Sequence, residues 1–167
     1  TSGTVTLIAD NAAGNNGDVI SMTDGSLIDA GTGDISLTTD GNVLLAGLLT
    51  TGTVEIDSLS AAILDNGDTH TDITSSIAVL NAVTGIGTGN PLETAISTLS
   101  ATVSEAGSLL IDNSIAIVLL DLSTFDGEIV INSTDTITAT SVVSNNDSDN
   151  DNNDIILTAT GSSSDIL

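Results

Sequence analysis

The residues with the clearest capacity for chemistry lie in one acidic stretch, residues 145–154, which contains only Asn, Asp and Ser. Carboxylates two residues apart, followed by further oxygen donors, are typical of loops that bind calcium, because calcium takes six to eight oxygen ligands. We therefore predict a calcium site in this stretch, and its expected ligands are Asp147, Asp149, Asp151 and Asp154.

The EF-hand calcium pattern is only partly present in this stretch. Counted from Asp147, the sixth position is Asn152, where an EF-hand has Gly, and the twelfth is Thr158, where an EF-hand has Glu. A solvated acidic loop between two strands is therefore the alternative interpretation.

His70 is the only histidine, and it lies in the sequence Thr-His-Thr-Asp. No Cys, Lys or second His is present to form a nucleophile–base pair with it, so we expect a surface residue at a corner of the chain. Pairs of aspartates could resemble the carboxylates of glycosidases or polysaccharide lyases. The lyases generally also need a Lys or Arg and an aromatic-lined groove, so we predict that the chain is not an enzyme.

The composition excludes several classes of function. The 167 residues include 23 acidic residues and no Lys, Arg or Cys, which gives a formal net charge of -23. Binding to nucleic acid or adsorption to an anionic membrane needs basic side chains. Disulfide scaffolds and zinc–thiolate sites need cysteine. None of these is compatible with the sequence.

The same composition raises the question of how the acidic charge is accommodated. Apart from weak pairing with His70, no carboxylate can form a salt bridge within the chain. Stacked strands would bring like charges within about 5–10 Å, close to the Debye length at physiological salt. We therefore hypothesise that divalent cations stabilise the fold, either at the acidic stretch or diffusely.

The apolar content indicates a folded chain. Leu, Ile, Val and Phe make up 50 of the 167 residues, well above the level that is typical of disordered proteins. We find no signal peptide and no apolar run long enough to span a bilayer. We expect residues 1–167 to form one segment, a fragment of a longer repetitive protein.

Short runs of alternating apolar and small polar residues predict β-strands throughout the chain. Gly, Asn and Asp separate these runs and are typical of tight turns. The clearest predicted strands are 5–8, 34–38, 53–57, 128–132, 136–140 and 154–158.

The spacing of these runs predicts a repeating coil. Ile35, Val54 and Ile73 are 19 residues apart twice in succession, and Leu109 and Ile129 are 20 apart. Two longer intervals, from residue 5 to 35 and from 129 to 155, contain Asn/Asp/Gly-rich insertions. About seven coils of roughly 19–20 residues, stacked as a parallel β-helix (β-solenoid), explain this spacing. An antiparallel sandwich or barrel is the alternative, but such folds usually bury large aromatic residues, and this chain has one Phe.

Residues 85–99 depart from this rhythm because a Gly-rich stretch is followed by Pro91 and Glu93. Pro at the first position of a helix and an acidic residue in its first turn favour a short helix. We favour a strand with at most a turn of helix at a corner. In the alternative, Ile96, Leu99 and Val103 are simply the apolar positions of the next coil.

Segment 85–99, GIGTGNPLETAISTL, resembles a segment that recurs in giant bacterial surface proteins with filamentous-haemagglutinin-like β-helix repeats. The phrases GTVTL, GDISLTTDGNVLL and GSLLIDNS are similar to coils of the same family. The resemblance implies a right-handed parallel β-helix in a secreted or cell-surface adhesin, stalk or matrix fibre, without a catalytic site.

The sequence therefore favours a structural function, a rod-like segment of a bacterial surface fibre, stalk or adhesin. Its expected partners are neighbouring coils or like subunits end to end, together with glycans of the cell surface or matrix. The alternative is a calcium-dependent module that binds carbohydrate or another surface ligand. A polysaccharide-lyase-type enzyme is the third hypothesis.

Overall fold

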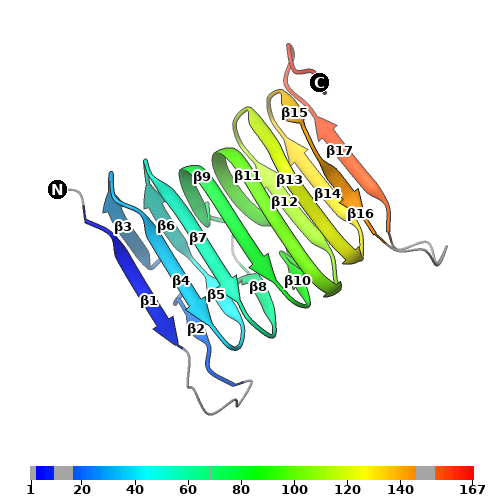
Figure 1. The fold of residues 1–167 in the computed structure, drawn as a ribbon. Helices are drawn as coiled ribbons and strands as arrows, with labels where there is room; N and C mark the ends of the chain where they lie inside the picture. Colours follow the sequence, from blue (N-terminus) through cyan, green and yellow to red (C-terminus); the bar gives the residue numbers. More distant parts are fainter. Residues whose placement is uncertain (1–2, 10–16, 68, 146–152) are drawn as a thin grey trace.

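The computed structural model describes residues 3–9, 17–67, 69–145 and 153–167. In these residues it contains seventeen β-strands, and every strand pair for which a register is defined is parallel. The strands stack as a β-solenoid of about six turns. In Figure 1 the near strands run downward, the chain returns behind them, and the coils advance from left to right, so the solenoid is right-handed. The predicted fold class is confirmed.

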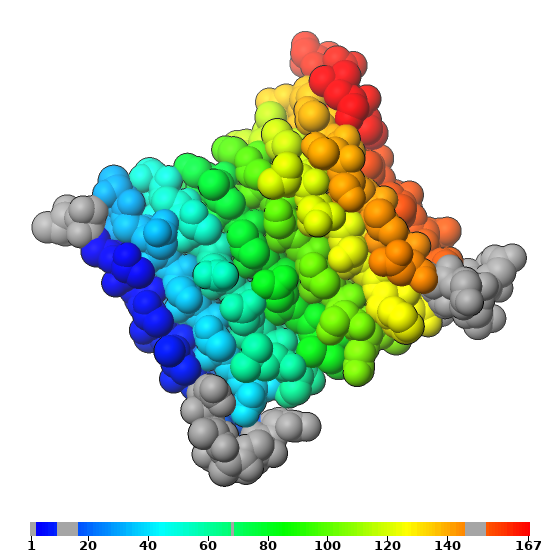
Figure 2. All heavy atoms as spheres, viewed as in Figure 1, coloured from blue at the N-terminus to red at the C-terminus, as the bar shows by residue number. Residues whose placement is uncertain are grey.

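The long face of the rod is a single ladder of parallel strands, which is the near surface in Figures 1 and 2. It contains β1 (Val5–Ala9), β4 (Ile35–Thr39), β7 (Thr53–Ser58), the second half of β9 (Ile73–Ala82), the middle of β11 (Leu92–Ala106), β13 (Ile117–Asp126), β15 (Ile137–Ala139) and β16 (Val142–Ser144). Figure 2 shows these strands as adjacent bands that follow the order of the sequence.

Two shorter faces close each coil behind the long face. The second face contains β2 (Ile20–Ser21), β5 (Val43–Leu45), β8 (Ala62–Asp65), β10 (Gly85–Ile86), β12 (Leu109–Asn113), β14 (Ile129–Ser133) and β17 (Ile155–Ala159). The third face contains β3 (Leu27–Gly31), β6 (Gly47–Thr50) and the first parts of β9 and β11. Strand β12 pairs with both β10 and β11, so from β12 onward the same strands serve both short faces.

Alternation along each strand directs one set of side chains into the rod. In β4, β12 and β14 every second residue is buried and the intervening residues are half-buried. Stacking then places apolar side chains above one another, for example Ile35 on Val54 and Leu109 on Ile129. All four of these side chains are 0 % exposed. The single Phe, Phe125, is 61 % exposed, so it lies outside the core.

The predicted strand runs and most of the predicted spacing are confirmed. Residue pairs 35–54, 109–129, 5–35 and 129–155 are register partners, so the two long intervals are coils that carry insertions. Several other coils also exceed 20 residues, which is why the chain forms about six turns where the sequence predicts about seven.

One predicted coil is wrong. The sequence pairs Val54 with Ile73, whereas Val54 pairs with Ala78 on the long face. Ile73 lies on the third face and pairs with Leu48. The physical reason is that β9 continues from the third face onto the long face without a break. Its first residue, Ile73, therefore lies on the third face, and the long face begins later in the same strand.

Segment 85–99 forms strands, and no helix is present in the described ranges. Pro91 directly precedes β11, and Ile96, Leu99 and Val103 are buried in the interior. The alternative interpretation of these three residues as apolar positions of the next coil is therefore confirmed. Consistent with the all-strand architecture, no helix in the described residues is long and apolar enough to cross a membrane.

Candidate metal centre

The predicted calcium site lies mostly outside the part of the chain that the structure describes. Asp147, Asp149 and Asp151 fall in the undescribed range, and only Asp154 can be placed. Asp154 is exposed directly before β17, and its backbone oxygen accepts a hydrogen bond of 2.8 Å from the amide of Ile129. With Asp126 and Glu128 it lines a surface hollow of about 310 Å³. Calcium binding at this stretch stays a prediction.

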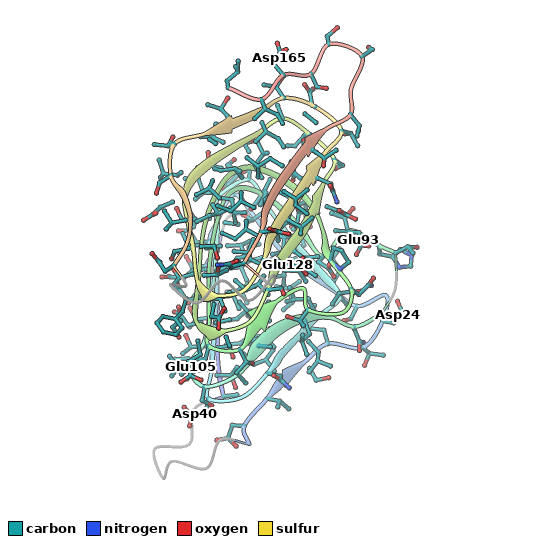
Figure 3. All side chains as sticks on the ribbon, turned by 90° about the vertical axis from the view of Figure 1, so that its right-hand side faces the viewer. Asp24, Asp40, Glu93, Glu105, Glu128 and Asp165 are labelled. Carbon is teal, nitrogen blue, oxygen red and sulfur yellow. The ribbon has the colours of Figure 1, made fainter. Side chains whose placement is uncertain are left out.

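A different group of carboxylates comes together at the junction of two coils. Asp65 ends β8, Asp72 directly precedes β9, and Glu93 is the second residue of β11. One carboxylate oxygen of each residue lies within 4.8 Å of the corresponding oxygens of the other two. We call these three residues the acidic cluster. Figure 3, which looks along the rod, shows Glu93 on the same side as Asp24 and away from Asp40 and Glu105.

Local backbone pairing fixes two members of the cluster. The amide of Asp72 donates to the Glu93 carbonyl at 2.8 Å, and the amide of Glu93 donates to Asp72 Oδ2 at 3.0 Å. The backbone oxygen of Asp72 also accepts from the amide of Leu48 at 2.7 Å. Asp72 is thereby held between the preceding and the following coil.

The third member is fixed by a side-chain contact. The Asn90 side-chain amide, in the turn that precedes β11, donates to Asp65 Oδ2. The loop between Asp65 and Asp72 leaves β8 and returns to the stack at β9, with Gly67 at a φ of +87° where an L side chain would be strained. The cluster therefore joins both ends of this loop to the next coil.

Asp72 is a buried residue, and Asp65 and Glu93 are half-buried. Asp72 is 0 % exposed, and Asp65 Oδ1, Asp72 Oδ1 and Glu93 Oε2 each expose less than 1 Å². Asp65 Oδ1 accepts no hydrogen bond from any residue in the described ranges. Carboxylate oxygens in such a set are the ligands that hard divalent cations prefer. The cluster could therefore hold such an ion.

Elsewhere on the rod, amide groups take the place of basic residues. The Asn81 side chain donates to Asp57 Oδ1 at 2.8 Å, and the Asn132 side chain donates to Asp112 Oδ1 at 2.8 Å. Both pairs join register partners on adjacent coils. Asn at the paired position of the next coil thus supplies a neutral hydrogen-bond donor to the carboxylate, in a chain that has no Lys or Arg to pair with it.

His70 lies where the sequence predicts it, on a surface loop. Its side chain is 73 % exposed, and Nδ1 lies 3.8 Å from Asp24 Oδ1, a carboxylate that is itself 62 % exposed. An ion pair between groups this exposed contributes little to stability.

The acidic cluster does not stand out in the sequence, because its members belong to three separate segments. A usable signal was present: Asp65 ends an apolar strand, Asp72 precedes one, and the interval from Asp72 to Glu93 is close to one coil length. Only the register of β9 on β11 shows that these positions meet.

Comparison with known proteins adds no further constraint on this site. No family model matches the chain, and no curated protein and no solved structure matches it significantly. The resemblance to filamentous-haemagglutinin-like repeats therefore stays a prediction from the sequence.

Proposed function

We propose that the chain is a structural rod segment whose end coils extend by pairing with further coils. The observation that carries this proposal is the ladder of buried apolar side chains along the rod, against which partly buried apolar side chains of the first and last described strands pack. Such a stack extends by repeating one kind of contact, as solenoid proteins do.

The end coils expose apolar side chains that a further coil would cover. At the amino-terminal end, Val5 and Leu7 pair in register with the buried Ile35 and Leu37, and Leu7 is 38 % exposed. At the other end, Ile155 stands on the buried Ile129 and is 45 % exposed. Strand edges with exposed apolar positions readily pair with other strands. The partners that fit are further solenoid coils or like subunits stacked end to end.

The wider context of this proposal comes from the sequence resemblance. We assign the rod to a bacterial surface fibre, stalk or adhesin that is secreted or held at the cell surface. The lack of Lys and Arg removes every trypsin cleavage site, which suits exposure to proteases. A polar exterior of Thr, Ser, Asn and Asp, with high negative charge, keeps such a rod in solution.

A calcium-dependent module that binds carbohydrate is the second candidate. The hollow beside Asp154, lined by Asp126 and Glu128, favours it, because these oxygens could bind an ion that in turn contacts sugar hydroxyls. Glycan-array binding that chelator abolishes and calcium restores would support this function. Loss of that binding in Glu128→Gln would place it at the hollow.

Two neighbouring isoleucines provide a matched test of end-to-end pairing. Ile155 and Ile156 are 45 % and 44 % exposed, but Ile155 is in line with the buried ladder and Ile156 faces outward. We expect the unaltered chain to form concentration-dependent rods in about 0.5 M NaCl, where charge repulsion is screened. Sedimentation velocity and negative-stain electron microscopy measure this association.

The two variants distinguish pairing through the ladder from nonspecific adhesion. Ile155→Lys places a charge in line with the buried apolar residues, where a further coil would have to pack, and should abolish association. Ile156→Lys places the charge on the outer side and should leave association intact. Circular dichroism checks that both variants stay folded. Equal loss of association in both variants, or a monomer at every concentration of the unaltered chain, would refute the end-to-end mechanism.

A further inference from the structure

We propose that Asp65, Asp72 and Glu93 form a built-in site for one divalent cation of the calcium type, which clamps two adjacent coils together. This site is separate from the predicted ligands in residues 147–154. It depends on the stacking of coils within one chain and is independent of association between chains.

The dimensions of the acidic cluster fit calcium. Oxygen ligands lie about 2.3–2.6 Å from calcium, so two ligands on opposite sides of the ion are at most about 4.6–5.2 Å apart. The three carboxylate oxygens lie within 4.8 Å of one another, so inward shifts of at most about half an ångström bring all three to one calcium ion. Magnesium, with oxygens at about 2.0–2.1 Å, would require the three groups to move closer together.

The burial of the cluster indicates that a positive charge belongs there. Burying an ionised carboxylate is costly unless a hydrogen bond, an opposite charge or a metal compensates it. Asp65 Oδ1 exposes less than 1 Å² and accepts no hydrogen bond from any residue the structure describes. Asp72, another member of the cluster, is 0 % exposed. This buried oxygen is an observation independent of the clustering itself.

The chain cannot supply that charge. It contains no Lys or Arg, and its one histidine, His70, lies at the surface beside Asp24. Hydrogen bonds already engage one oxygen of each aspartate, because Asn90 donates to Asp65 Oδ2 and the Glu93 amide donates to Asp72 Oδ2. A cation from solution, or a proton shared within the cluster, would compensate the charge at Asp65 Oδ1.

A bound cation would also have a structural consequence. Asp65 and Asp72 bracket the loop that leaves the stack after β8, and Glu93 belongs to the next coil. One ion would therefore fix both ends of the loop and join them to β11. Binding only the folded chain would raise its stability by mass action.

Isothermal titration calorimetry with calcium chloride tests this site, in about 0.15 M KCl to suppress diffuse binding to the acidic surface. We expect one saturable site per chain in the unaltered protein. Asp65→Asn and Glu93→Gln should each weaken calcium binding at least tenfold. Glu55→Gln, on the exposed outer side of β7, removes the same charge as Glu93→Gln and should leave the affinity unchanged.

Thermal unfolding in calcium and in chelator distinguishes loss of the cation site from misfolding of a variant. Saturating calcium should raise the Tm of the unaltered chain by about 5–10 °C over chelator. In chelator, the cluster variants should unfold at the same temperature as the unaltered chain or higher, because each substitution removes like-charge repulsion. A variant that merely failed to fold would unfold at a lower temperature in both conditions.

Three outcomes would overturn the proposal. The first is the absence of a saturable calcium site. The second is a site that survives both cluster variants and is lost in Asp154→Asn, which would place the ion at the acidic stretch. The third is a Tm that changes with pH and with the cluster variants but not with calcium, which would assign a shared proton to the cluster.

Discussion

At the scale of single residues, the corners of the coils depend on polar side chains that point inward. Asn113 is 2 % exposed, and its side chain accepts from Thr94 Oγ1 and from the Ile96 amide at 2.9 Å each. It also donates to the carbonyls of Ile96 and Ile115, at 3.3 Å and 2.6 Å. One side chain thus satisfies four polar groups at a corner where strand pairing cannot reach them.

Removing this side chain should be costly. In Asn113→Ala the Ile96 amide and the Ile115 carbonyl lose a buried partner, so we expect the free energy of unfolding to fall by about 2–4 kcal/mol. Urea denaturation measures this change. Asn81→Ala, which removes an amide that bonds Asp57 on the outer side, should cost about 1 kcal/mol or less. Equal costs for the two variants would contradict the role of the buried corner.

The acidic cluster shows which part of a site single residues can predict. Its oxygen-rich chemistry follows from Asp and Glu alone, as it does for the acidic stretch at 145–154. Its position does not, because Asp65, Asp72 and Glu93 come from three separate segments that meet only when the coils stack. A contiguous motif such as Asp147, Asp149 and Asp151 is visible in the sequence, whereas a site assembled across coils requires the register.

At the scale of the strands, the corners limit how closely successive coils can stack. Gly107 lies between β11 and β12, and Gly127 occupies the same corner one coil later, between β13 and β14. A Cβ atom at Gly127 would overlap the backbone carbonyl of Gly107, and one at Gly107 would overlap that of Thr84. Backbone approaches backbone directly at this corner, so only glycine fits.

Gly127→Ala should therefore destabilise the rod. The added methyl group meets backbone that cannot move without disturbing the pairing of β12 with β14, so we expect a loss of about 1–3 kcal/mol. Gly17→Ala, where a Cβ would have open space, should change stability by less than about 0.5 kcal/mol. Thermal unfolding of the two variants, followed by circular dichroism, gives the comparison. A neutral Gly127→Ala would mean that the coils are stacked less closely than described.

The strands also show how far sequence patterns predict this fold. Alternation predicts six strands correctly, and it is clearest in β4 and β14, where buried and half-buried residues alternate. The pairing of Val54 with Ile73 failed where β9 passes from the third face to the long face without a turn. Likewise Pro91 and Glu93 suggested a helix where β11 begins. Local signals mark turns, but they do not mark a corner inside a continuous strand.

At the scale of the whole molecule, the rod combines an apolar interior with an acidic exterior that carries no Lys or Arg. The interior is stabilised by burial of rows of Ile, Leu, Val and Ala, and the backbone is paired from coil to coil. The formal charge of -23 opposes this compaction. Asp–Asn hydrogen bonds join adjacent coils, and the proposed cation at the acidic cluster would offset part of this charge.

The rod, the pairing of its end coils and the cation site all depend on parallel stacking of the coils. Distances between paired spin labels would measure this stacking most directly. Thr6, Ser36, Glu55, Val79, Ser100 and Asp121 are successive register partners on the outer side of the long face. The chain has no native Cys, so pairs of introduced cysteines can be labelled without interference.

With one label fixed at residue 6, we predict distances of about 14, 19 and 24 Å to labels at residues 79, 100 and 121. Each step adds about 4.8 Å, the spacing between adjacent strands. Double electron–electron resonance measures these distances. Distances that fail to increase in this order would contradict the solenoid and every proposal that depends on it.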